Sequence, residues 1–274
     1  MAVSSSPLAR SNSSEAGGLR IVSAGHAAFA IATIALGVIT LVTHELTAVW
    51  MPVPKWAMSA HTAFVYLWAL ISIGAGFALL WRRSALLAAQ LLFAFSLFWV
   101  VLFRLPNLFY EKPLVLVGWA FGKTAIMLAA AWVLCRWFAT DHFPSFVFEG
   151  TGLRLARALY GVSLIPFGLA HFMYLSATTV LIPNWLPWHV GMAYVTGAAF
   201  IAAGLAMIFD ILGGLAAALS TLQLGLFGLI VWVPRVLAGN VTDFQRGEFI
   251  VTFALAAAAW VVADSYQGPK NSGS

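Results

Sequence analysis

The sequence predicts an all-α, polytopic membrane protein in which eight transmembrane helices form two parallel four-helix repeats. Three observations lead to this prediction: the composition, eight long apolar stretches, and a similarity between the two halves of the chain. Of 274 residues, 62% are hydrophobic and 8% are charged, and the mean hydropathy is +0.94. Soluble domains carry about 25% charged residues, so the composition excludes a soluble enzyme. The net charge of +5 is spread too thinly to form a nucleic-acid-binding surface, and the expected partner is the lipid bilayer.

Eight stretches of the chain are long enough to cross a bilayer, which takes about 20 apolar residues in a helix. Each stretch is apolar on all sides, whereas the strands of a membrane barrel alternate apolar and polar residues. The predicted spans are residues 21–43, 62–81, 84–103, 113–137, 156–175, 188–209, 211–233 and 249–263.

The segments outside these spans define the domain organisation. Residues 1–20 are polar and rich in serine, so we predict a disordered tail and not a cleavable signal peptide. The first membrane unit is predicted over 21–138 and the second over 154–266, with a linker at 139–153. Residues 267–274 form a short C-terminal tail.

The distribution of basic residues predicts the orientation. With the N-terminus inside, the inner segments hold eight Lys and Arg residues and the outer segments hold five. Cytoplasmic loops of membrane proteins carry the excess of positive charge. We therefore predict a bacterial plasma (inner) membrane protein with both termini in the cytoplasm.

The two halves of the chain resemble each other when they are shifted by 128 to 131 residues. Gly76 then aligns with Gly204, Pro106 aligns with Pro234, and the sequence Ala-Ala-Ala-Trp-Val occurs both at 129–133 and at 257–261. These three matches share a single shift of 128. Each half holds an even number of spans, so both halves enter the membrane from the same side and the repeat is parallel. We expect any site at the interface of the halves or in matching pockets.

Lys123 is the ionisable residue that lies deepest in a predicted span, about ten residues into the fourth one. A charge in the hydrocarbon layer is costly, so such a residue is a candidate functional group. Its counterpart in the second half is Val251, so only one half carries it. The alternative is a structural lysine that bonds backbone carbonyls or Gln90 between helices.

A second group of candidate ligand-binding residues lies at the predicted outer ends of the spans. Its members are His44, His61, His171, His189, Arg104 and Arg235. Imidazole and guanidinium groups in this position could bind an anion, a metal or the carbonyl oxygens of a quinone. No histidine pair has the HxxxH spacing of a metal site, and the single cysteine, Cys135, excludes a Cys-based zinc site. We therefore predict no metal, and packing of interfacial histidines stays an alternative.

Residues 157–237 resemble the DoxX-like integral membrane proteins. The resemblance lies in the Gly-Leu-Ala-His-Phe stretch around His171, the Pro-Asn-Trp-Leu-Pro turn that begins at Pro183, the Tyr-Val-Thr-Gly stretch that ends at Gly197, and Val-Pro-Arg at 233–235. It implies a four-helix membrane unit, which would occur twice in this chain. It also implies a redox association, because the family name is similar to that of the small subunit of a thiosulfate:quinone oxidoreductase.

The chain differs from the family in two features, and both weaken the prediction of a redox association. The chain has no cysteine pair, and Phe200 and Trp232 stand where relatives often carry histidine. A ligand or metal site in the second half would be weaker for that reason.

Three functional hypotheses follow. The first is a redox-associated subunit that binds quinone or another lipophile near the outer face, where His171, His44, Arg235 and Arg104 would position carbonyl oxygens by charge-assisted hydrogen bonds. Its partners would be subunits of a redox complex. The second is a small-solute transporter or conduit at the repeat interface around Lys123, and the third is a non-catalytic assembly partner. Whether the protein is an enzyme stays open.

Overall fold

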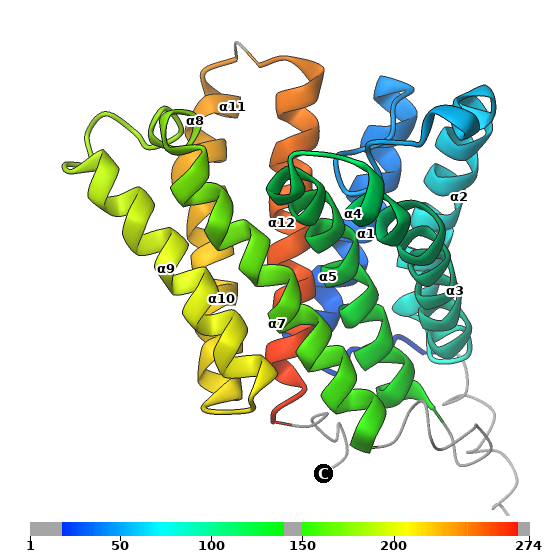
Figure 1. Cartoon of the computed structure of the whole chain (residues 1–274). Helices are drawn as coiled ribbons and strands as arrows, with labels where there is room; N and C mark the ends of the chain where they lie inside the picture. The colour runs from blue at the N-terminus through cyan, green and yellow to red at the C-terminus, as the bar shows by residue number, and fades with distance from the viewer. Residues whose placement is uncertain (1–17, 140–149, 240, 268–274) are drawn as a thin grey trace, which may run out of the picture.

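The computed structural model describes residues 18–139, 150–239 and 241–267. Within these ranges it contains eight helices that are long and apolar enough to cross a membrane, and no named strand (Figure 1). This confirms the prediction of an all-α, polytopic membrane fold. The tails at 1–17 and 268–274 and most of the predicted linker lie outside the described residues.

The helices of the first half follow one another in an up-and-down order. They are α1 (Ala24–Thr43), η3 (Lys55–Ala60), α2 (His61–Leu79), α3 (Ala85–Trp99), η4 (Val100–Arg104), α4 (Leu105–Tyr110) and α5 (Leu114–Phe138). The second half repeats this order. Its elements are α7 (Gly150–Met173), α8 (Leu175–Thr179), α9 (His189–Ile208), α10 (Gly213–Phe227), η5 (Gly228–Trp232), α11 (Val233–Leu237) and α12 (Asp243–Asp264).

Several helices are longer than the spans predicted from hydropathy. The last helix begins at Asp243 and not at 249, because Thr242 and Gln245 form a capping box in which each side chain accepts a backbone N–H of the other residue. Helix α7 begins at Gly150, four residues before the predicted start of the second unit. Polar residues in a first helical turn lower the local hydropathy, so these boundaries were placed too late.

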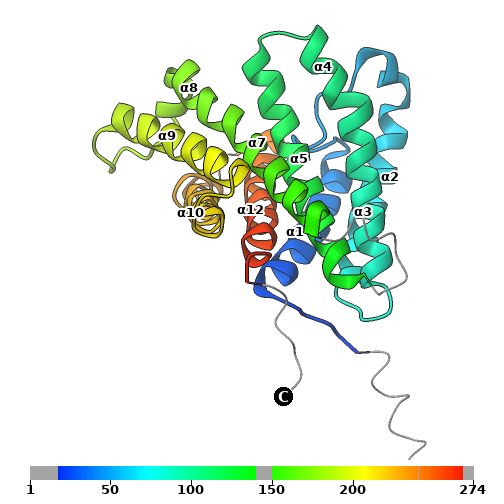
Figure 2. The same cartoon turned by 60° about the horizontal axis from the view of Figure 1, so that its bottom comes forward.

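The two halves interlock. Within each half, consecutive long helices pack on one another, from α1 to α2, α3 and α5, and from α7 to α9, α10 and α12. Between the halves, α1 packs on α12, α7 packs on α5, and α5 packs on α12 (Figures 1 and 2). The first helix of each half thus packs both on the next long helix of its own half and on the last helix of the other half, so neither half is a closed four-helix bundle. The parallel repeat stays a prediction, with which these paired contacts agree.

Helices α5 and α12 form the centre of this arrangement. In each, 61% of the apolar window is buried inside the protein, compared with 33% to 50% in the other six spans. Their alanine-rich stretches, Ala129–Ala131 and Ala256–Ala259, are buried. Small side chains let helices approach closely in lipid, and here they place the two halves in direct contact.

The third helix of each half contains a π-helical turn at a matching position. Val100–Arg104 precedes Pro106, and Gly228–Trp232 precedes Pro234, at the shift of 128 residues found in the sequence. Proline has no N–H to donate to the carbonyl one turn earlier, and a wider turn accommodates the interruption. The last residue of each π-helical turn, Arg104 or Trp232, has its side chain in the protein interior.

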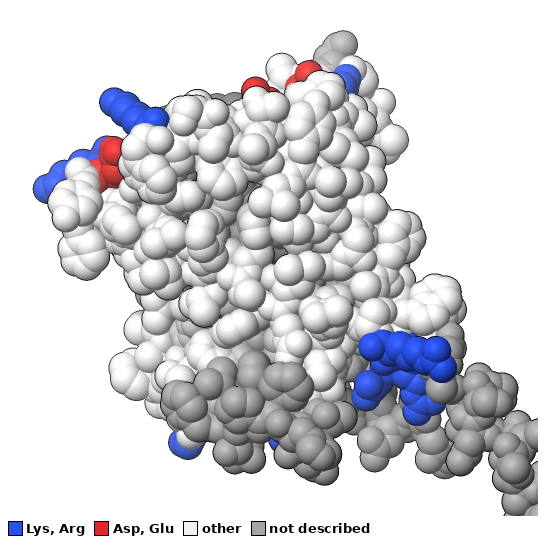
Figure 3. Space-filling view, turned by 90° about the vertical axis from the view of Figure 1, so that its right-hand side faces the viewer, with Lys and Arg blue, Asp and Glu red and all other residues white. Residues whose placement is uncertain are grey.

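Charged side chains lie at the two ends of the helices. The face of α2 and α3 shown in Figure 3 has both basic and acidic residues near its upper end, only Lys or Arg among the coloured residues near its lower end, and an uncharged band between them. Such a band matches the hydrocarbon layer of a bilayer. The first and last described segments meet at one end, where the Gly25 amide N donates to Asp264 Oδ2 over 3.1 Å. We call this the terminal end; its assignment to the cytoplasm stays a prediction.

Close helix contacts predict a difference between two glycines of α2. A Cβ on Gly76 would lie 2.9 Å from the Ala30 carbonyl oxygen of α1, whereas a Cβ on Gly74 would meet open space. We expect Gly76→Ala to lower the free energy of unfolding by about 1–3 kcal/mol through this clash. Gly74→Ala should leave it unchanged or raise it by up to about 1 kcal/mol. Thermal unfolding of both variants in detergent tests this, and equal losses would contradict the close α1–α2 contact.

Candidate functional site

The candidate site lies where α5 meets α12, and its centre is a buried ion pair. Lys123, the tenth residue of α5, donates from Nζ to Glu248 Oε1 of α12 over 2.9 Å. The side chains are only 5% and 11% exposed. The ammonium group also lies 4.0 Å from the centroid of the Trp119 ring, within the range of a cation–π interaction. The partner of Lys123 is therefore a carboxylate of the other half, and neither Gln90 nor a backbone carbonyl.

Glu248 was missed in the sequence because the predicted last span began one residue after it. The capping box at Thr242 and Gln245 is the signal that could have found it, since such a box marks a helix start. A helix that starts at Asp243 places Glu248 in its second turn, inside the span. The ion pair could then have been proposed between two spans.

The ion pair is asymmetric with respect to the sequence repeat. At the shift of 128 residues, Lys123 corresponds to Val251 and Glu248 corresponds to Ala120. The pair that would be its repeat counterpart, Ala120 with Val251, is apolar. The chain therefore carries one charged contact at the α5–α12 seam, with complementary charges supplied by the two halves.

Arg104 is buried beside this seam and holds the loop between α1 and α2. Its side chain is 1% exposed. The guanidinium donates from Nη1 to the Pro52 carbonyl over 3.1 Å, and from Nη2 to the carbonyls of Val49 over 3.1 Å and Met51 over 2.6 Å. Its Nε donates to Thr124 Oγ1, next to Lys123, over 3.1 Å. Arg104 thus ties the loop to α5 through neutral oxygen atoms.

The second half has no arginine at the position that corresponds to Arg104. Trp232 stands at the position that corresponds to Arg104, and its indole Nε1 is buried without a hydrogen-bond partner among the described residues. The Arg235 guanidinium lies 5.8 Å from the Trp232 ring and donates to the Val180 carbonyl over 2.9 Å. Arg235 therefore anchors the loop after α8, in a more exposed position.

The candidate histidines have separate partners. In the first half, His61 Nε2 lies 3.4 Å from Glu45 Oε2, and His44 Nδ1 lies 3.4 Å from the Tyr66 hydroxyl. These two contacts share the end of the protein opposite the terminal end.

In the second half, the ring N–H groups of two histidines bond backbone carbonyls. His171 Nδ1 donates to the Phe167 carbonyl one turn earlier in α7 over 2.8 Å, and His189 Nε2 donates to the Pro183 carbonyl over 3.2 Å. The predicted ring of imidazoles and guanidinium groups is therefore divided among local contacts. Within the described part of the chain, no cluster of three or more His, Cys, Asp or Glu residues could hold a metal ion.

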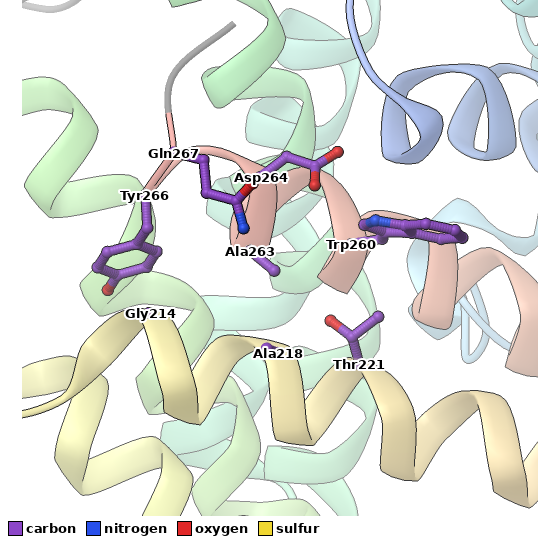
Figure 4. A pocket seen from close by; sticks show the side chains of 8 residues that line it. All are labelled: Gly214, Ala218, Thr221, Trp260, Ala263, Asp264, Tyr266 and Gln267. Carbon is purple, nitrogen blue, oxygen red and sulfur yellow. The ribbon is translucent and has the colours of Figure 1, made fainter. Parts of the chain in front are cut away.

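Two cavities open at the ends of the protein. The first, which we call the outer cavity, has a volume of about 300 Å³ and lies over Arg104, at the end opposite the terminal end. The second has a volume of about 250 Å³ and lies between α10 and the end of α12. Thr221 and Gln267 project into it from opposite walls (Figure 4).

Tyr266 lines the second cavity and is held by a cation. The Arg157 guanidinium lies 3.8 Å from the centroid of its ring. Burial raises the pKa of the Tyr266 phenol, and the neighbouring Arg157 charge only partly offsets this shift. Its hydroxyl is buried without a hydrogen-bond partner among the described residues. These contacts fix the end of α12 against α7 and α10.

Comparison of the chain with protein-family models, with curated proteins and with solved structures returns no match. The DoxX-like resemblance therefore stays a prediction from residues 157–237. What the fold establishes is an integral membrane protein with eight apolar helices.

Proposed function

We propose that the protein moves protons or other small ions across the membrane at the seam between α5 and α12, and that Lys123 and Glu248 act in this movement. The observation that carries the proposal is the buried ion pair between the two halves. An ionisable residue inside a membrane span commonly marks a substrate or ion pathway, and it pairs with an opposite charge there.

Stability alone gives little reason for such a pair. Replacing a buried ion pair by apolar side chains of similar size is often neutral or stabilising. The corresponding repeat positions, Ala120 and Val251, are occupied by apolar residues in the same seam. A pair whose charges come from different halves can also open when the halves move against each other. These points favour a functional role for the charges over a purely structural one.

The test distinguishes a role of the two charges in transport from a role of the two side chains in helix packing. Purified protein is reconstituted into liposomes loaded with a pH-sensitive dye, and proton flux is recorded under imposed pH, K⁺ and Cl⁻ gradients. We expect flux above that of empty liposomes, and its loss in the double variant Lys123→Met/Glu248→Leu, which keeps the volume without the charges.

The control removes an ion pair from the exposed start of the same helix. Arg246→Gln breaks the contact of Arg246 with Asp243, whose side chains are 52% and 69% exposed, and flux should stay at the wild-type level. Absence of flux in the wild type, or unchanged flux in a folded double variant, would refute the proposal.

The quinone-binding subunit stays a prediction. One observation is compatible with it: the Nε2 atom of His171 makes no hydrogen bond within the described chain, and its ring lies 5.7 Å from that of Phe200. A half-buried imidazole beside an aromatic ring could receive the carbonyl of a lipophile. The seam with the ion pair supports transport more directly, because it joins the two halves.

A further inference from the structure

We propose that the outer cavity binds a phosphate group. The cavity has a volume of about 300 Å³ and lies between the loop after α1 and the start of α5. Three cationic residues and one acidic residue line it: Lys55, Arg104, Lys112 and Glu111. This site is separate from the Lys123–Glu248 pair, and the proposal does not depend on transport.

The charges around the cavity are unbalanced. Ion pairs within the described residues join His61 to Glu45, Lys123 to Glu248 and Arg246 to Asp243. None of them joins Glu111 to Lys55 or Lys112. The lining therefore presents two exposed ammonium groups and a buried guanidinium against a single carboxylate, which favours an anionic occupant.

Arg104 is a buried residue that lines the cavity, and within the described residues no carboxylate forms an ion pair with it. Its hydrogen bonds go to three backbone carbonyls and the Thr124 hydroxyl, all of them neutral acceptors. A guanidinium has five N–H groups, so these four bonds leave one N–H on Nη1. A buried cation is stabilised by a paired anion, and phosphate oxygens match the guanidinium geometry.

The start of α5 adds to the positive potential. Leu116 and Val117 of its first turn line the cavity, its N-cap is Pro113 without a side-chain hydrogen bond, and its first turn has no acidic residue. The corresponding helix α12 supplies its own cap from Thr242 and an acidic residue in its first turn. The Leu116 and Val117 N–H groups already donate to the Pro113 carbonyl, over 3.1 and 3.3 Å, so the helix start contributes the positive end of its dipole and not free donors.

Phosphate at the end of a membrane protein can come from a phospholipid headgroup or from solution, and the experiment distinguishes these sources. The full-length protein, purified in detergent, is titrated with inorganic phosphate, with phosphatidylglycerol and with sodium chloride at equal ionic strength. Its twelve tryptophans report thermal unfolding. We expect phosphate or phosphatidylglycerol, but not chloride, to raise the unfolding temperature. A shift with inorganic phosphate indicates a soluble ligand, and a shift with phosphatidylglycerol alone indicates a headgroup.

The variant Lys55→Gln/Lys112→Gln removes two exposed charges and leaves the Arg104 clamp in place. We expect this variant to raise the apparent Kd for inorganic phosphate or phosphatidylglycerol, whichever stabilises the wild type, by about tenfold or more. A hydrogen bond to a charged group contributes about 1.5–3 kcal/mol. Its control, Arg235→Gln/Arg246→Gln, removes two cations from the same end of the second half and should bind as the wild type does. Equal weakening in both variants, or no shift with either phosphate source, would overturn the proposal.

Discussion

Lys123→Met is expected to lower the free energy of unfolding by about 3–5 kcal/mol, because it leaves the Glu248 carboxylate buried without its partner. Glu248→Leu should have a similar effect through the unpaired ammonium group. The double variant Lys123→Met/Glu248→Leu should recover most of the loss, since the seam between α5 and α12 then becomes apolar throughout. A double-mutant cycle by thermal unfolding in one detergent measures the coupling.

Arg246→Gln provides the comparison for this cycle. It breaks an exposed ion pair on α12 and should cost at most about 1 kcal/mol. If the two single variants at the seam cost no more than this control, the ion pair is not buried as described. If the double variant is no more stable than either single variant, the loss in the single variants does not come from an unpaired charge, and the predicted coupling of Lys123 and Glu248 is wrong.

Arg104→Met is expected to lower the free energy of unfolding by about 2–6 kcal/mol. The Met51 and Pro52 carbonyls are part-buried, and each loses its hydrogen bond from the guanidinium; a hydrogen bond to a charged group contributes about 1.5–3 kcal/mol. The Val49 carbonyl still accepts from Thr124 Oγ1 over 2.6 Å, so it adds less. Thermal unfolding of the purified variant gives the magnitude.

Two further variants sharpen this prediction. Arg104→Lys should recover little, because a single ammonium group cannot reproduce the planar set of donors that reaches four acceptors. Arg235→Met removes one partly exposed hydrogen bond and should cost at most about 1 kcal/mol. A full recovery by lysine would show that charge, and not the hydrogen-bond geometry, holds the loop.

Most of the fold follows from the sequence, because a membrane span is defined by local composition. All eight spans were predicted, and the errors lie at their ends. The first turn of α12 contains Asp243 and Arg246, which look like loop residues to a hydropathy average but belong to a capped helix. The third span was predicted to end at 103, yet the helical path continues through the π-helical turn to Tyr110.

The contacts of the candidate residues could be predicted only in part. The sequence shows the depth of Lys123, and the capping box at Thr242 places Glu248 inside a helix, but the sequence does not show that these two side chains, 125 residues apart, meet. Which faces of two helices meet depends on packing of the whole protein. The histidines were predicted as ligand-binding residues from their type and position, but His171 donates to the carbonyl one turn earlier in its own helix. Residue type alone does not distinguish such a local bond from a ligand site.

The interlocking of the halves has a consequence for biosynthesis. Helix α12 emerges from the ribosome after α1 and α5, which both pack on it. The faces of α1 and α5 that pack on α12 therefore remain uncovered, and Lys123 remains without Glu248, until α12 inserts. The covalent chain supplies both members of the ion pair in one molecule, Lys123 from the first half and Glu248 from the second.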